Sequence, residues 1–175
     1  MDFKELLLSK HSKVVTNNIV QYIGDSPVKF KLFLDVFKDQ NPILIQRAAW
    51  PLGYIGEQQP QLIIPHLKTI LKNTQQPWHV AYKRNVFRVL CKINQIPATF
   101  HSEVFNLGLL HSMDLSNPTA VRAFAMQVAT KIALIYPELK QELIPHFEYL
   151  SMENSPAIKS SLKHCQIKLN KLKND

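Results

Sequence analysis

Basic and aromatic residues gather in the middle of the chain, in a pattern that suits the binding of phosphate groups. No acidic residue occurs between Glu57 and Glu103. The same stretch carries seven residues that we call the basic set: Lys68, Lys72, Trp78, Tyr82, Arg84, Arg88 and Lys92. Clustered cations without neutralising acids attract nucleic-acid phosphates or another polyanion, and aromatic rings beside them can stack on bases. The basic set is therefore the candidate binding site of the sequence.

A structural interpretation of the basic set stays open beside this one. Arg84, Arg88 and Lys92 are spaced by four residues and form a column on one helix face. Such a column is often a solvated surface that keeps a protein in solution. A tryptophan near a helix start, like Trp78, more often packs between neighbouring helices than it binds a ligand.

Motifs for other chemistries do not occur in the sequence. There is no GxSxG elbow for a nucleophile and no GxGxxG or GxxxxGK(S/T) loop for phosphates, and the chain has only four glycines. Seven histidines are present, but neither HExxH nor paired CxxC spacing accompanies them. We expect no catalytic residue, no metal and no cofactor.

Length and composition indicate one folded domain over residues 1–175. Hydrophobic residues make up 46% of the chain, charged residues 19%, and the net charge is +8. No apolar run approaches the roughly 20 residues needed to cross a bilayer. Cys91 and Cys165 are isolated, which is typical of a reduced protein, so a cytoplasmic location is expected.

Prolines divide the chain at regular intervals. Four X-Pro pairs stand where helices are expected to begin: Asn41-Pro42, Gln76-Pro77, Asn117-Pro118 and Ser155-Pro156. The polar side chain can accept from the free amides of the first turn, and proline at the first helical position loses no hydrogen bond. A second series falls between them, at Pro27, Pro60, Pro97 and Pro137. The chain is therefore expected to alternate between two kinds of helix.

A repeat of about 38 residues with two helices per unit is typical of stacked helical solenoids. Each helix pair is too thin to bury its own apolar face, so it must stack on the next pair. We predict an all-α fold of about four antiparallel helix pairs and a C-terminal capping helix. The expected pairs span residues 12–39, 42–73, 77–113 and 118–151, and the expected cap spans 156–173.

Two of these units share a detailed pattern. Residues 41–71 contain Asn41-Pro42, Arg47 before two alanines, and the run Leu62-Ile63-Ile64-Pro65-His66-Leu67. Residues 117–150 repeat it with Asn117-Pro118, Arg122-Ala123 and Leu143-Ile144-Pro145-His146-Phe147. The pattern resembles HEAT repeats, which implies a right-handed α–α superhelix of the HEAT or armadillo type. The resemblance covers roughly residues 12–173, with a divergent copy at 77–113.

The resemblance also bears on the two repeat arginines. HEAT repeats often have aspartate where Asn41 and Asn117 stand, so a ladder of Asp–Arg pairs between neighbouring repeats is not expected here. Arg47 and Arg122 can instead donate to carbonyl or amide oxygens.

The resemblance implies a non-enzymatic scaffold that binds a protein partner. In HEAT-like proteins the partner often binds along the second helices of the pairs. Nucleic acid or another polyanion is the alternative partner, because some HEAT-like proteins of similar size and charge are alkylpurine DNA glycosylases. That chemistry needs a carboxylate among aromatic residues, and here only Glu103 or Asp114 stands at the edge of the basic stretch. Bilin lyases share the fold, but the two cysteines give that interpretation no support.

Overall fold

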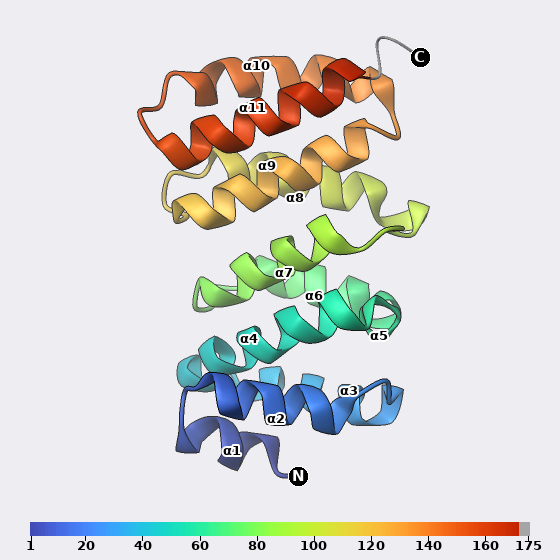
Figure 1. Cartoon of the computed structure of the whole chain (residues 1–175), viewed down its shortest axis with the longest axis vertical. Helices are drawn as coiled ribbons and strands as arrows, with labels where there is room; N and C mark the ends of the chain where they lie inside the picture. Colours follow the sequence, from blue (N-terminus) through green and yellow to red (C-terminus); the bar gives the residue numbers. More distant parts are fainter. Residues whose placement is uncertain (172–175) are drawn as a thin grey trace. The chain divides into compact units, whose positions relative to one another are not determined.

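The computed structural model describes residues 1–171, and all regular elements within that range are helices (Figure 1). The predicted all-α fold is confirmed. The chain divides into two compact units, Met1–Gln95 and Ile96–Asp175. The prediction of a single domain stays a prediction, and each unit is described by itself. None of the described helices is long and apolar enough to cross a membrane.

The first unit is built from two layers of helices. Its elements are α1 (Phe3–Ser9), α2 (Lys13–Ile23), α3 (Pro27–Leu34), η1 (Asp35–Asp39), α4 (Pro42–Gln58), α5 (Pro60–Ile63), η2 (Ile64–His66), α6 (Leu67–Thr74) and α7 (Ala81–Lys92). Helix α4 packs between α2 and α7 in one layer, and α6 lies behind α7 in the other (Figure 1). Consecutive helices thus pack as in a helical solenoid.

The second unit repeats this arrangement. Its elements are η3 (Ala98–Phe100), α8 (His101–Met113), α9 (Thr119–Ala133), η4 (Pro137–Leu139), α10 (Lys140–Ser151) and α11 (Pro156–Lys171). Helix α9 packs against both α8 and α11, and α10 packs against α8, α9 and α11. The predicted cap corresponds to α11, and the last two predicted positions, 172 and 173, lie outside the described residues.

Two of the predicted helix starts are confirmed in detail. Asn41 Oδ1 accepts hydrogen bonds from the amides of Ile43 at 2.9 Å and Leu44 at 3.4 Å. Ser155 Oγ accepts from the Ile158 amide at 3.4 Å. These side chains satisfy donors that have no partner inside the helix, which explains why α4 and α11 begin at Pro42 and Pro156.

Of the other two predicted starts, the one at Pro77 is wrong, and the one at Pro118 is one residue early and lacks the predicted side-chain cap. Helix α7 begins at Ala81 instead of Pro77, and in the turn before it the His79 Nδ1 accepts from the Ala81 amide at 3.2 Å. The Asn117 side chain does not cap α9, which begins at Thr119. Its amide donates to Asp114 Oδ2 at 2.9 Å, so it is held in the preceding turn.

The core of the first unit lies between its two layers. Side chains from α4, α5, α6 and α7 meet there: Leu52, Ile63, Leu67, Ile70, Val86, Val89 and Leu90. In the second unit, Gly108 brings α8 close to α9. A Cβ at this position would lie 2.9 Å from the Ala125 carbonyl oxygen and 2.9 Å from the Ala129 backbone nitrogen. Glycine therefore sets the spacing of these two helices.

Candidate functional site

The lysines and arginines of the basic set lie on two helices of the first unit. Lys68 and Lys72 are exposed on α6, and Arg84 and Lys92 are exposed on α7. None of these four side chains forms an ion pair with a residue in the described part of the chain. Because α6 and α7 belong to different layers, the four cations do not share one helix face (Figure 1).

Arg88 has a partner that sequence spacing did not reveal. Its Nε lies 3.0 Å from Glu57 Oε1, and its Nη2 donates to Glu57 Oε2 at 3.3 Å. The guanidinium also lies over the ring of Tyr54, with Cζ 5.3 Å from the ring centroid. Glu57 and Tyr54 come from α4, so the arginine holds α7 against α4. Its charge is neutralised inside the unit.

The two aromatic residues of the basic set pack inside the first unit. Trp78 stacks on Phe37, with ring planes 17° apart, and meets the Tyr82 ring edge to face. Tyr82 is only 1% exposed, and its hydroxyl donates to the Ile70 carbonyl at 3.2 Å. Burial raises the pKa of Tyr82, and a hydrogen bond with Asn73 opposes this shift. The role predicted for the basic set stays a prediction, but Tyr82 lies in the core.

The two repeat arginines donate to main-chain carbonyls, as their positions predicted. Arg47 Nη1 donates to the carbonyls of Leu7 at 2.8 Å and Leu8 at 3.0 Å, at the end of α1. Arg122 Nε donates to the Ser112 carbonyl at 2.9 Å, near the end of α8. Both arginines thus satisfy carbonyls that have no partner within their own helix.

Histidines make structural contacts in both units. His101 bonds to the Tyr136 hydroxyl at 3.0 Å and to the Ile96 carbonyl at 2.7 Å through its two ring nitrogens. In the first unit, the His66 ring packs against Phe30. Within residues 1–171, no group of three His, Cys, Asp or Glu side chains is placed to hold a metal ion.

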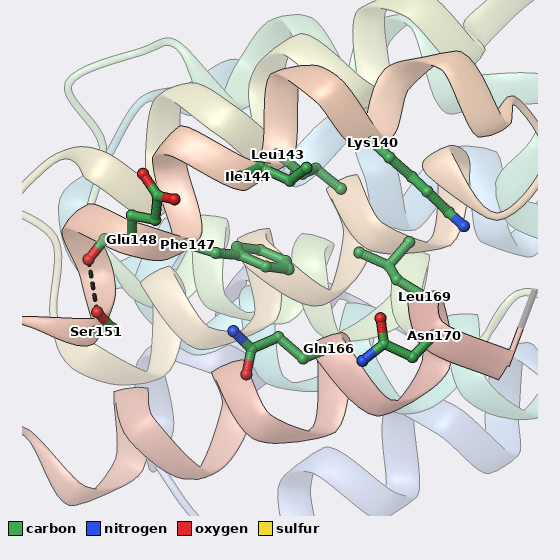
Figure 2. Close-up of a pocket in the computed structure, with 9 residues that line it drawn as sticks. All are labelled: Lys140, Leu143, Ile144, Phe147, Glu148, Ser151, Gln166, Leu169 and Asn170. Carbon is green, nitrogen blue, oxygen red and sulfur yellow. Dashed lines mark hydrogen bonds between the residues drawn. The ribbon is translucent and has the colours of Figure 1, made fainter. Parts of the chain in front are cut away.

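A groove of about 490 Å³ runs between α10 and α11, and we call it the α10–α11 groove (Figure 2). Its apolar floor consists of Leu143, Phe147 and Leu169, and Figure 2 shows Phe147 and Leu169 pointing into the space between the helices. Ile144 lines the groove from α10 and is 53% exposed. The three floor side chains are themselves buried, so Ile144 is the lining residue that exposes apolar surface to solvent here.

Polar side chains edge the α10–α11 groove on both helices. Lys140, Glu148 and Ser151 come from α10, and Gln166 and Asn170 come from α11. The Ser151 hydroxyl donates to the Glu148 main-chain carbonyl at 2.6 Å (Figure 2). The Ser151 hydroxyl proton is therefore donated within its own helix. An apolar floor with a polar rim is the usual composition of a surface that binds another molecule.

Comparison with known protein families supports the repeat pattern. A family model described as HEAT repeat domain matches residues 3–169. The chain belongs to the HEAT repeat family. HEAT repeats are generally scaffolds for protein interactions. Neither the curated proteins nor the solved structures gave a match to the chain.

Within the predicted repeat arrangement, the α10–α11 groove lies between the second helix of the last pair and the capping helix. No pattern in the sequence singled out this groove. In the sequence, the run from Leu143 to Phe147 serves only as part of the repeat pattern, and in the structure Leu143 and Phe147 are buried. One feature of the sequence could have predicted the exposure of Ile144. This residue directly follows the buried Leu143 in a helix, and successive helical side chains point about 100° apart.

Proposed function

We propose that this HEAT repeat protein is a non-enzymatic scaffold that binds a protein partner, with the α10–α11 groove as one contact surface. The observation that carries the proposal is the exposed Ile144 above the apolar floor of that groove. Exposed apolar surface with a polar rim is typical of interaction sites. Membership of the HEAT repeat family supports the same conclusion.

Three side chains of the described part of the chain have pKa values shifted by their own packing and hydrogen bonds. The hydrogen bond from Arg122 lowers the pKa of Glu153. Burial raises the pKa of the Cys165 thiol, as it does for the Tyr82 hydroxyl. None of these three side chains lines the α10–α11 groove. A general acid or base would be expected to combine a shifted pKa with a place in a cavity.

The test is affinity capture from native lysate with the full chain as bait, in three forms. The wild type is compared with Ile144→Asp, which places a charge in the groove. Ile167→Asp is the matched control, because Ile167 is 47% exposed on α11 and does not line the groove. We expect the wild type and Ile167→Asp to retain the same protein and Ile144→Asp to lose it. Failure of the wild type to retain any specific protein would overturn the scaffold proposal.

A second candidate function is polyanion binding by the exposed cations of the basic set. The observation in its favour is that Lys68, Lys72, Arg84 and Lys92 make no ion pair within the described residues. Binding of duplex DNA can be measured by fluorescence anisotropy as salt rises from about 50 to about 200 mM. Four phosphate contacts should cost roughly two decades of affinity over this range. Binding that does not respond to salt, or no binding, would exclude this function.

A further inference from the structure

We propose that the α10–α11 groove binds an acidic amphipathic helix of the partner protein. This inference rests on the scaffold function proposed above and adds the chemistry of the partner. Three observations carry it: the apolar floor of the groove, the two helices that form its walls, and the excess of lysines along its rim.

The two helices beside the groove are long enough to lie along a short ligand helix. Its walls are α10, with 12 residues, and α11, with 16 residues. At about 1.5 Å per residue, these helices are roughly 18 and 24 Å long. A ligand helix of three to four turns therefore matches the wall length. Apolar residues of that helix at positions i, i+3, i+4 and i+7 would contact Ile144, Phe147 and Leu169, as in other helix-in-groove complexes.

The side of α11 that forms the groove wall faces away from α9. Ser161 lies on the α9 side, where its hydroxyl accepts from Gln127 Nε2 at 3.0 Å. Gln166 and Asn170 lie on the groove side. Helical spacing places Lys159 and Lys163 on the same stripe as these two residues, at successive steps of four, three and four. All four side chains are exposed, so Lys159 and Lys163 extend the α11 wall of the groove.

The charges of the rim favour an acidic ligand. Lys140, Lys159 and Lys163 stand along the two walls and form no ion pair with a described residue. Glu148 is the acidic residue that lines the groove. Glu142 lies two positions beyond Lys140 and hence on another face of α10. Three cations against one carboxylate leave the rim positive, and carboxylates of a ligand helix would complement it.

The apolar floor of the groove favours a peptide helix over a nucleic acid as the ligand. Ile144, Phe147 and Leu169 offer no hydrogen bonds to phosphate, and the Glu148 carboxylate would repel it. An amphipathic peptide helix uses both parts of the groove, because its apolar face contacts the floor and its carboxylates reach the lysines.

The test uses a synthetic peptide and the full chain. The probe is a peptide of about 16 residues with leucines on one helical face and glutamates elsewhere. Two control peptides have the same length: one carries lysine in place of glutamate, and one has the acidic sequence scrambled. Binding is measured by fluorescence anisotropy, and the site is mapped by amide chemical shifts of the ¹⁵N-labelled protein.

We expect the acidic helix to bind and to shift amides of α10 and α11, and the two control peptides to bind at least about tenfold more weakly. Ile144→Asp should weaken binding about tenfold or more, and Lys163→Glu by several fold. Two matched controls, Ile167→Asp and Lys168→Glu, should stay within about twofold, since helical spacing places both residues off the stripe of Lys159, Lys163, Gln166 and Asn170. Circular dichroism confirms that each variant is folded.

Several outcomes would overturn the inference. These are equal binding of the lysine peptide, shifts that map outside α10 and α11, or displacement of the acidic peptide by duplex DNA from the same residues. The scaffold proposal fails separately, when the lysate capture retains no protein. If capture succeeds and Ile144→Asp does not affect it, the scaffold function stands and the groove inference falls.

Discussion

Arg122 and Glu153 form a bidentate ion pair in the second unit. The Arg122 Nη1 donates to Glu153 Oε2 at 2.9 Å, and Nη2 donates to Oε1. The arginine side chain is only 7% exposed. Because Arg122 Nε also binds the Ser112 carbonyl, one side chain joins the end of α8, the helix α9 and the segment after α10.

Removal of this arginine should destabilise the protein strongly. Arg122→Ala leaves the Ser112 carbonyl and the Glu153 carboxylate without their donor, and we expect a loss of about 3 kcal/mol in the free energy of unfolding. Arg122→Lys keeps the charge but cannot form the two hydrogen bonds to the Glu153 carboxylate, so its loss of unfolding free energy should be intermediate. Urea unfolding followed by circular dichroism measures both. Lys159→Ala, an exposed control, should change stability by less than about 0.5 kcal/mol. A similar value for Arg122→Ala would contradict a structural role of the pair.

The same pair predicts a pH dependence of stability. The hydrogen bond and charge of Arg122 hold the pKa of Glu153 below its ordinary value of 4.5. A depressed pKa in the folded state gives stabilisation that is complete above the ordinary pKa and is lost as the pH falls through the folded pKa. The Glu153→Gln variant should therefore lose stability at neutral pH and show a flatter decline below about pH 4.5. Equal slopes for wild type and variant in acid would contradict the prediction.

Gly108 should not tolerate alanine, although alanine favours helices. Relief of glycine's backbone entropy is worth up to about 1 kcal/mol, whereas overpacking costs about 1 to 3 kcal/mol. The nearest atoms to the new Cβ include the Ala125 oxygen and the Ala129 nitrogen, which belong to the backbone of α9 and cannot rotate away. We expect Gly108→Ala to lower the melting temperature. Ser102→Ala, at an exposed position of the same helix, is the control. A rise in melting temperature for Gly108→Ala would show that α8 and α9 can move apart freely.

Arg84 and Arg88 should respond differently to alanine, although they are one turn apart on α7. Arg88→Ala removes the ion pair with Glu57 and the contact with Tyr54, and it should cost about 1 to 2 kcal/mol of stability. Arg84→Ala should leave the unfolding free energy within about 0.5 kcal/mol, since Arg84 is exposed. In the duplex-binding assay the order should reverse, with Arg84→Ala the weaker binder. Equal effects in both assays would refute this division.

Local features of this protein could be predicted from the sequence, because they depend on neighbours a few residues apart. The helix starts at Asn41 and Ser155 require only a polar side chain, a proline and the amides that follow. The alternation of helices was predicted from the spacing of the prolines. The resemblance to HEAT repeats came from the pattern that residues 41–71 and 117–150 share, and the family match over residues 3–169 confirms it. The repeat pattern likewise predicted that Arg47 and Arg122 donate hydrogen bonds to carbonyl oxygens.

Contacts between helices were decided by the tertiary structure alone. Arg88 and Lys92 occupy the same column of α7 in the sequence, but only Arg88 meets Glu57 of α4, because packing brings that carboxylate to one turn of the helix. Tyr82 has the spacing of a surface aromatic and lies in the core, because Phe37 and Trp78 close over its ring. The α10–α11 groove depends on where two helices diverge. Helical periodicity states which side of each helix is apolar, whereas the distance between two helices depends on all the side chains that separate them.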